Sequence, residues 1–296
     1  MKILVIGGSY FFGRWFVQVT YRDHDIILLN RGSIKTGLDG VLELVCDRHD
    51  KEGLKALSPT FGAIDVVVDF CAYEKGDIDG ILEFLDTDRL SRYIFISTVD
   101  VYKHDGDREL NEDAPMADDF VQGPQGDYIA GKVALERELR SAEAKYGIKG
   151  VSVRPAVLYG PLNYAPRESI YFEWIDKAGQ IIHPLDADGY WQMVYVGDAA
   201  RALKILCELP DDETDRAYNF CTGDRISYDV FEKALEALGT PFEKVDISVK
   251  EADERYIPLP FPLRAEESAY YSPDRFEKLL PDTTGLVEGL LRARKV

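Results

Sequence analysis

Hydrophobic and polar positions follow two alternating patterns along the first half of the chain. Short apolar runs rich in β-branched residues, typical of buried strands, are separated by segments with apolar residues at helical spacing. The predicted strands are Ile3–Ile6, Ile26–Leu29, Leu42–Val45, Val66–Phe70, Tyr93–Ser97 and Gly150–Arg154. The predicted helices lie at about Arg14–Tyr21, Lys51–Leu57, Ile78–Leu85 and Tyr128–Tyr146.

This alternation predicts an α/β fold with a doubly wound parallel sheet of the Rossmann type. Such a sheet binds ligands outside the carboxyl ends of its strands. We expect residues 1–156 to form mainly a dinucleotide-binding domain, completed by a return segment at about 190–225. Residues 157–190 and 226–296 are expected to form a smaller C-terminal lobe that binds the substrate.

A glycine-rich turn follows the first predicted strand, with Gly7, Gly8 and Gly13 ahead of the helical segment at Arg14. Glycines allow a phosphate to approach the backbone, and a helix N-terminus offers N–H groups and a positive dipole end. The turn therefore predicts a pyrophosphate site, although Tyr10 stands where a middle glycine is usual. A turn that serves only packing is the alternative. The expected cofactor contacts here are Gly7, Ser9, Tyr10, Phe11, Phe12 and Gly13.

The next two strands end in polar residues that predict further cofactor contacts. Asn30 and Arg31 follow the second strand, where an NAD site usually carries an acid. An arginine there can pair with a 2′-phosphate, so NADP is favoured over NAD, with a solvated arginine as the alternative. After the third strand, Asp47 is expected to accept from the adenine amino group and Arg48 to flank the ring. Asp50 fits better as the N-cap of the following helix.

The fourth and fifth strands end in small, aromatic and hydroxyl residues. Phe70 and Ala72 are expected to pass beside the cofactor, and Tyr73 to reach the substrate or else to pack as an ordinary aromatic. Thr98 is placed to orient a substrate oxygen, and Asp100 follows it closely. The alternative is that these residues cap the strand and turn.

A tyrosine and a lysine lie one turn apart on the long helix that follows an acidic loop at Lys103–Gly126. A lysine ammonium beside Tyr128 would stabilise its phenolate, so Lys132 is expected to lower the pKa of Tyr128. The phenolate can then take a proton from a secondary alcohol while a nicotinamide takes the hydride. Lys132 is also expected to bind the cofactor through the nicotinamide ribose. Gly131 is unfavourable inside a helix, which predicts close approach of another backbone. Glu136 is expected on the polar face of this helix.

Composition and charge narrow the classes of function. The chain has 296 residues and a formal net charge of −18, which disfavours binding to a nucleic-acid backbone. Its four cysteines are widely spaced, so no metal site is expected. With no signal peptide and no apolar run of membrane-spanning length, we expect a cytoplasmic protein that does not bind a membrane.

These motifs, taken in order, resemble a known family. The run from Gly7 to Gly13, then Ser97-Thr98-x-x-Val101-Tyr102, Tyr128-x-x-x-Lys132 and Arg154-Pro155-x-x-Leu158-Tyr159-Gly160-Pro161 resemble the extended short-chain dehydrogenases/reductases of the NAD-dependent epimerase/dehydratase group, as does Val194–Ala202. The resemblance implies that Thr98, Tyr128 and Lys132 are catalytic and that Pro155 and Val157 lie beside the nicotinamide. It also leaves a homodimer open, because a two-helix dimer interface is usual in that family.

The resemblance implies an NAD(P)-dependent epimerase or reductase acting on a nucleotide-linked sugar. Among the aromatic residues that follow Pro161, Arg167 is expected to hold the diphosphate of the substrate, with ordinary burial of these aromatics as the alternative. Asp100 falls where sugar dehydratases carry a catalytic acid, but Val99 replaces a second acid, which disfavours a dehydratase. Tyr10 and Asn30-Arg31 resemble a sub-branch related to chloroplast stem-loop RNA-binding proteins. The alternative function is therefore a non-catalytic NAD(P)-binding regulator or an RNA-binding protein on the same fold.

Overall fold

A seven-stranded parallel sheet forms the centre of the computed structural model, which describes residues 1–104 and 108–295. The strand order is β11-β7-β5-β4-β1-β2-β3, so the chain winds outward in both directions from β1. The bounds are β1 Lys2–Ile6, β2 Asp25–Asn30, β3 Leu42–Val45, β4 Val66–Asp69, β5 Arg92–Ile96, β7 Lys149–Pro155 and β11 Ala217–Phe220. The predicted doubly wound α/β fold is confirmed.

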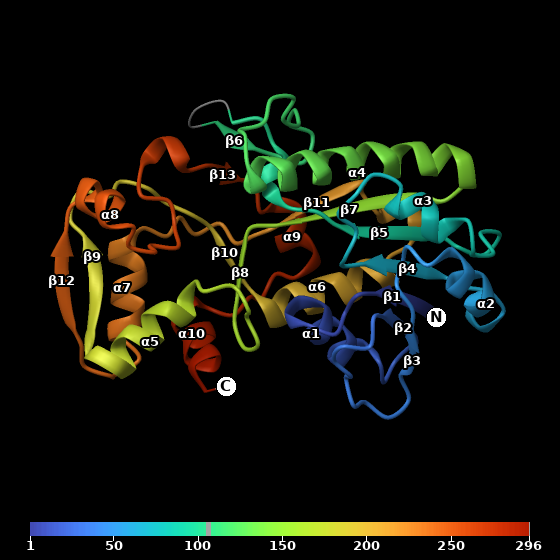
Figure 1. Cartoon of the computed structure of the whole chain (residues 1–296), viewed down its shortest axis with the longest axis horizontal. Helices are drawn as coiled ribbons and strands as arrows, with labels where there is room; N and C mark the ends of the chain where they lie inside the picture. Colours follow the sequence, from blue (N-terminus) through green and yellow to red (C-terminus); the bar gives the residue numbers. More distant parts are fainter. Residues whose placement is uncertain (105–107, 296) are drawn as a thin grey trace.

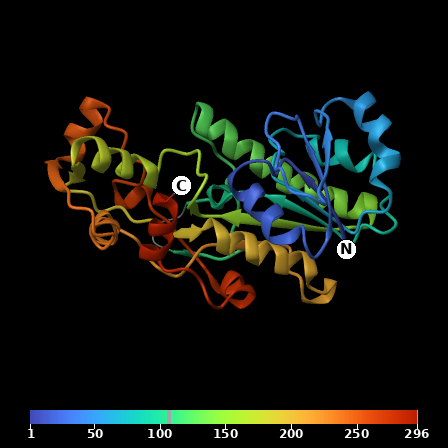
Figure 2. The ribbon, with the colours of Figure 1, turned by 90° about the horizontal axis from the view of Figure 1, so that it is seen from below.

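Alternate residues of each strand face opposite layers of helices. Ile3 and Val5 belong to a core shared with α1 (Phe11–Thr20) and α6 (Val196–Glu208), whereas Leu4 and Ile6 belong to another core. That second core includes α2 (Lys51–Phe61), α3 (Asp77–Leu82) and α4 (Pro124–Tyr146). Figure 1 shows α3 and α4 above the sheet with α1 and α6 below it, and Figure 2 shows α1 and α6 side by side.

The remaining elements lie mainly at the other end of the molecule (Figure 1). Short parallel pairs form between β8 (Val157–Tyr159) and β10 (Met193–Tyr195), between β9 (Gln180–Pro184) and β12 (Glu243–Ile247), and between β6 (Glu109–Leu110) and β13 (Tyr270–Tyr271). The helices are α5 Glu168–Ala178, α7 Tyr228–Glu236, α8 Val249–Arg255, α9 Asp274–Leu279 and α10 Leu286–Arg294, with 3-10 turns at Val99–Val101, Asp211–Glu213 and Ala265–Glu267. Within the described residues, no helix is both long and apolar enough to cross a membrane. The expected division into two lobes stays a prediction.

Two helix starts differ from those predicted. Helix α1 begins at Phe11 rather than Arg14, because the extended backbone of Tyr10 forms its N-cap and the glycine turn is shorter than expected. Helix α4 begins at Pro124 rather than Tyr128, since a proline suits the first helical position. The predicted irregular loop at 103–126 also contains β6, which pairs with a strand distant in sequence.

The glycine turn is shaped by packing as well as by conformation. Gly7 and Gly8 have φ values of +90° and +68°, which favour glycine. A Cβ on Gly8 would lie 2.7 Å from Val5 Cγ1, and one on Gly13 would lie 2.4 Å from the Cα of Gly8. Helix α1 therefore closes directly onto the strand, and its N-terminus is held at the carboxyl edge of the sheet.

Gly131 lies where another backbone approaches α4, as the sequence predicted: an added Cβ would be 2.7 Å from the carbonyl oxygen of Tyr73. We expect Gly131→Ala to lower the free energy of unfolding by about 1–3 kcal/mol, since the clash outweighs the better helix propensity of alanine. Gly80→Ala on α3 is the control, because nothing lies within 4 Å of its added Cβ. In urea denaturation, Gly80→Ala should leave the free energy of unfolding unchanged or raise it. An equal decrease in both variants would contradict the role of the clash at Gly131.

Candidate active site

A cleft of about 930 Å³ lies at the carboxyl ends of β1, β2, β4 and β5. Nearly all the predicted site residues line it: Gly7, Ser9, Tyr10, Phe11, Phe12, Gly13, Asn30, Arg31, Asp47, Arg48, Phe70, Tyr73, Thr98, Asp100, Tyr128, Lys132, Pro155 and Arg167. Ala72 is buried beneath the cleft. Val157 lines a neighbouring cleft, and Leu158 lines this one instead.

Tyr128 and Lys132 project from one face of α4, but they differ in exposure. Tyr128 is 40% exposed, whereas Lys132 is 3% exposed. The Lys132 ammonium donates to the carbonyl oxygens of Ala72 at 3.0 Å and Ile96 at 2.9 Å. Its Nζ lies 5.7 Å from the centroid of the Tyr128 ring and 4.7 Å from that of Tyr73. Lys132 thus ties α4 to the ends of two strands.

The pKa of Tyr128 differs from the sequence expectation. Burial raises this pKa, Asp100 and Tyr73 raise it further, and Arg167 opposes them. The expected lowering by Lys132 is therefore wrong for the protein without a ligand. The reason is that Lys132 directs its ammonium to two backbone carbonyls, which leaves the phenol beside the carboxylate of Asp100.

Burial lowers the pKa of Lys132 to about 8, from 10.5. Between these values the unfolded chain binds more protons than the folded one, so the contribution of Lys132 to stability rises with pH. We expect the free energy of unfolding of the wild type, relative to Lys132→Met, to increase by roughly 1–2 kcal/mol from about pH 8 to about pH 9.5.

The measurement is urea denaturation of both proteins across this pH range. Lys177→Met is the control, because the Lys177 side chain is 73% exposed and the relative stability of that variant should stay flat. A flat or falling difference for Lys132→Met would contradict the lowered pKa.

Thr98 and Asp100 lie together at the open end of β5. The Thr98 hydroxyl donates to Asp100 Oδ2 at 2.9 Å and accepts from the Asp100 backbone N–H at 3.2 Å. The capping role considered from the sequence is therefore present, at the start of the Val99–Val101 turn. Thr98 and Tyr128 both line the cleft, so the capping role does not exclude a contact between Thr98 and a substrate.

Two polar residues at the end of β2 differ in their contacts: Asn30 is hydrogen-bonded within the protein, whereas Arg31 is exposed at the cleft. Asn30 donates to the Ser9 hydroxyl at 2.9 Å and accepts from the Gly32 N–H at 2.7 Å, so it links β2 to the glycine turn. Arg31 is exposed at the cleft and forms no ion pair or hydrogen bond within residues 1–104 and 108–295. Its guanidinium is thus available to an anion.

Arg48 is held by partners that the sequence did not predict. Its guanidinium donates to both carboxylate oxygens of Asp69 at 2.9 Å and to the carbonyl of Asp77 at 2.7 Å. The Tyr93 hydroxyl donates to the same Asp69 at 2.6 Å. Arg48 therefore lines the cleft while its charge is already paired. Asp50 caps α2 by accepting from the Gly53 N–H, as predicted.

A second buried network was missed by the sequence analysis. Glu136 was expected on the polar face of α4, but it is 3% exposed and forms a two-pronged ion pair with Arg154 at 2.6 and 2.8 Å. Ser97 donates to Glu136 at 2.7 Å, and Arg154 donates to the Tyr102 hydroxyl. The available signal was the charged Arg154 inside a predicted strand, which needed a buried acid nearby.

A smaller cleft of about 470 Å³ adjoins the first, with Asp100 and Ala156 in the lining of both. Its wall comes from the segment before β10, from β13 and from the loop before α4, including Gln192, Tyr271 and Phe120. Asp100 therefore lies where the two clefts meet, whereas Thr98, Tyr128 and Lys132 line the larger cleft alone. Arg167 lines the larger cleft, at the N-cap of α5.

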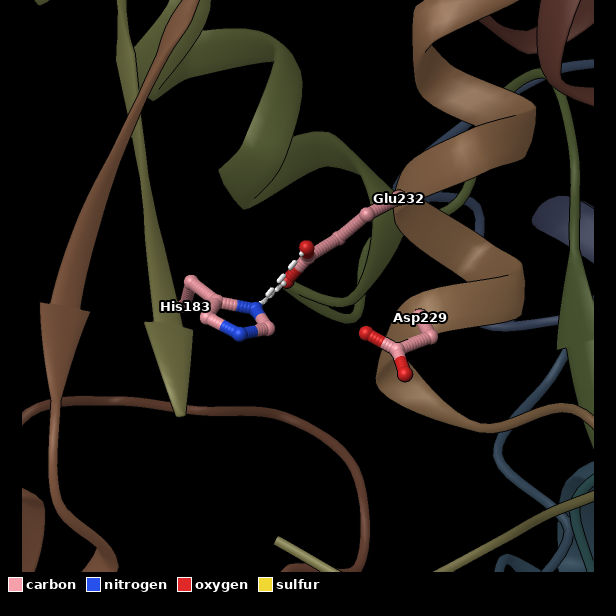
Figure 3. Close-up of side chains that lie close together, drawn as sticks. All are labelled: His183, Asp229 and Glu232. Atoms are coloured by element: carbon pink, nitrogen blue, oxygen red, sulfur yellow. Dashed lines mark hydrogen bonds and ion pairs between the residues drawn. The ribbon is translucent and has the colours of Figure 1, made fainter. Parts of the chain in front are cut away.

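One cluster of metal-ligand type lies elsewhere, between β9 and α7 (Figure 3). His183 Nδ1 lies 2.9 Å from Glu232 Oε2, and Asp229 lies nearby. The ammonium of Lys244 is 3.0 Å from the same Glu232 oxygen and 3.0 Å from Glu236. The buried carboxylate thus already has a cationic partner, so this geometry fits an ion-pair network.

Fold and site together define a Rossmann-fold protein with a Tyr-x-x-x-Lys pair at the cofactor edge, the class of the extended short-chain dehydrogenases/reductases. A family model described as the NAD dependent epimerase/dehydratase family matches residues 3–221. The chain therefore belongs to the NAD dependent epimerase/dehydratase family, a family of enzymes.

Individual relatives agree with this assignment. The chain is 30% identical over 257 residues to the chloroplast stem-loop binding protein of 41 kDa b of Arabidopsis thaliana, covering 80% of this chain and 63% of that protein. It is 24% identical to a dTDP-glucose 4,6-dehydratase of Streptomyces niveus, with 83% and 80% covered. The structure of the Thermus thermophilus UDP-glucose 4-epimerase with NAD has a TM-score of 0.75 at 22% identity, with 100% and 98% covered, which shows the shared fold.

Proposed function

We propose that this protein is an NAD(P)-dependent epimerase or reductase acting on a nucleotide-linked sugar. The observation that carries the proposal is the cleft itself, in which Tyr128, Lys132 and Thr98 line the same space as the glycine turn. The solved structures of similar fold include an epimerase bound to UDP-glucuronic acid and NAD, which supports this substrate class.

The residues present fit a dinucleotide cofactor. No side chain within the described residues caps the N-terminus of α1, so the N–H groups of Phe11, Phe12 and Gly13 can bind a pyrophosphate. Gly7 and Gly8, whose positive φ values favour glycine, present backbone without side chains at this point of the turn. A volume of about 930 Å³ lies within the range of small-molecule sites. Pro155, which lines the cleft, is proposed to border the nicotinamide.

The proposed chemistry uses Tyr128 as the group that exchanges a proton with a sugar hydroxyl. Thr98, held by Asp100, orients the oxygen, and Lys132 fixes α4 against the strand ends. A bound oxidised nicotinamide would supply the hydride acceptor and a positive charge that favours the phenolate form of Tyr128. Arg167 is proposed to hold the diphosphate of the substrate, with Tyr73 and Asp100 beside the sugar. The homodimer implied by the family stays a prediction that sedimentation can test.

Arg31, which has no charge partner among the described residues, leads to a prediction about cofactor choice. In wild-type protein we expect NADP to raise the melting temperature more than NAD. Arg31→Ala should weaken NADP binding roughly ten- to hundredfold, because a charge-assisted pair with the 2′-phosphate is worth about 1.5–3 kcal/mol, and leave NAD binding unchanged.

Thermal shift measures the change in melting temperature with each cofactor, and calorimetric titration measures the affinity for NAD and NADP. Arg137→Ala is the control, because this exposed α4 residue does not line the cleft. Equal binding of NAD and NADP by the wild type would contradict the preference. Binding of neither would contradict the proposed function.

RNA binding is the second candidate, because the relative with 30% identity is a stem-loop binding protein. The net charge of −18 opposes it, since binding to a phosphate backbone depends on basic side chains. A stem-loop RNA titration at moderate salt separates the two. Affinity that survives there, in protein lacking sugar conversion, would favour the RNA-binding function.

A further inference from the structure

Lys132 lies inside a cage of three aromatic rings. Its ammonium lies over the rings of Tyr73, Phe95 and Tyr128, with Nζ 4.7, 4.8 and 5.7 Å from the ring centroids. A cation is attracted to an aromatic face within about 6 Å of the centroid. Two N–H groups of the ammonium donate to strand-end carbonyls, and no nitrogen or oxygen in residues 1–104 and 108–295 accepts the third. We call the three rings the lysine cage.

The charge inside the lysine cage has no counter-ion of its own in the part of the chain that the structure describes, because no carboxylate there forms an ion pair with Lys132. Asp69, Asp77 and Cys71 raise the pKa of the lysine. Burial, the largest effect, lowers this pKa, and so does Arg48. The carboxylates of Asp69 and Asp77 are paired with Arg48 instead. The rings and the two carbonyls therefore take the place of water and of a counter-ion around the ammonium.

Tyr73 is the most exposed ring of the lysine cage. Phe95 is buried in β5, and Tyr128 is 40% exposed with the most distant ring. Tyr73 is 54% exposed, lines the cleft and has the ring nearest to Nζ. Lys132 lines the same cleft, yet it is 3% exposed. A ring that contacts the ammonium and is itself exposed at the cleft separates the charge from the water of the cleft.

The backbone that carries Tyr73 is fixed independently of its side chain. The Tyr73 N–H donates to the buried carboxylate of Asp77 at 2.8 Å, and the Gly76 N–H donates to Glu138 of α4 at 2.6 Å. The carbonyl oxygen of Tyr73 lies against α4 at Gly131. Since none of these contacts uses the phenol ring, a smaller side chain at this position should leave the path of the loop unchanged.

We propose that Tyr73 is a positioning residue for the proposed reaction, one that shields Lys132 from the cleft and fixes its charge one helix turn from Tyr128. The contact stands on the geometry of the lysine cage, and its catalytic consequence rests on the proposed function. A dehydrated charge held in one place acts more strongly on a neighbouring group than a hydrated, mobile one. The phenolate that forms on Tyr128 during proton transfer is that neighbouring group.

The first experiment measures the pKa of Lys132 without substrate or cofactor. NMR titration of protein with isotopically labelled lysine ε-carbons follows the ionisation, and the signal lost in Lys132→Met identifies the residue. Tyr73→Ala admits water to the ammonium, so we expect the pKa of Lys132 to rise from about 8 towards 10.5. Tyr73→Phe keeps the ring and should leave this pKa unchanged.

Tyr10→Ala is the matched control for the titration. Tyr10 lines the same cleft and is 56% exposed, but its ring is not one of those over the ammonium. The pKa of Lys132 in this variant should equal that of the wild type.

The second experiment measures kcat for conversion of UDP-glucose. Tyr73→Ala should lower kcat about tenfold, because the lysine charge becomes hydrated and mobile, and this factor lies within the range of a lost cation–π contact. Tyr73→Phe should keep the wild-type kcat. A ring that only packed against the sugar would change KM and leave the pKa of Lys132 as it is.

Three results would overturn the inference. One is a pKa of Lys132 that is unchanged or lower in Tyr73→Ala. Another is an equal rise in Tyr73→Phe or Tyr10→Ala, because the effect would then not come from the ring over the ammonium. The third is a wild-type kcat in Tyr73→Ala although the pKa has risen. A wild type that converts neither UDP-glucose nor UDP-glucuronic acid would overturn the proposed function, while the NMR titration still decides whether Tyr73 shields Lys132.

Discussion

Tyr128→Phe should lower kcat for nucleotide-sugar conversion by roughly 10²–10⁴-fold, the usual contribution of a positioned proton-transfer group. The substitution removes only the hydroxyl of a side chain that is 40% exposed, so the fold should be unchanged. The pKa of Tyr128 is raised in the protein alone, so we also expect activity to rise with pH where the phenolate forms. Conversion of UDP-glucose or UDP-glucuronic acid, followed by chromatography, makes the measurement.

The control for this variant is Tyr256→Phe, because Tyr256 is 91% exposed and does not line the cleft. Cofactor binding should be the same in both variants, so a loss of activity in Tyr128→Phe reports chemistry and not binding. If conversion by Tyr128→Phe proceeds at the wild-type rate, proton transfer by Tyr128 is wrong even where the cofactor binds.

Glu136→Ala is expected to lower the free energy of unfolding by about 3–5 kcal/mol. The carboxylate is 3% exposed, and it is the partner of the buried Arg154 guanidinium and of Ser97. Its removal leaves a buried positive charge without its counter-ion, which costs more than the lost attraction itself. Urea denaturation at neutral pH gives the difference.

Glu173→Ala is the matched control, because Glu173 forms an exposed ion pair with Lys177 on α5. Exposed pairs of this kind contribute less than about 1 kcal/mol. If Glu136→Ala lowers the free energy of unfolding by no more than the control does, the prediction is wrong. Arg154 would then keep a charge partner or reach water after the substitution.

Local patterns were sufficient to predict the order of the main strands and helices in the first half of the chain, and the edge of the sheet where the candidate site lies. Strand positions followed from apolar runs, because both faces of a parallel sheet are buried. The end of α4 at Tyr146 and the N-cap at Asp50 followed from backbone chemistry that acts within a few residues. The close approach at Gly131 followed from a residue that its helix alone disfavours.

Contacts between distant residues could not be predicted from such patterns. Glu136 fits an exposed helical position by periodicity, and only the fold brings Arg154 to it. Arg48 likewise lay in a segment predicted to bind the cofactor, yet its guanidinium forms an ion pair with the carboxylate of Asp69. The lowered pKa expected for Tyr128 failed for the same reason, since the spacing in a helix does not say where a lysine ammonium finds its acceptors.

The strand β11 lies beside β7 in the sheet, although more than sixty residues separate them along the chain. Helix α6, which covers α1, also comes from this late segment. During synthesis, the half of the molecule that holds the glycine turn therefore emerges without its last strand and without one of its covering helices. A nascent chain that stops before residue 220 leaves the β7 edge unpaired, and such edges recruit other chains. Chaperone dependence should thus be greatest before β11 leaves the ribosome.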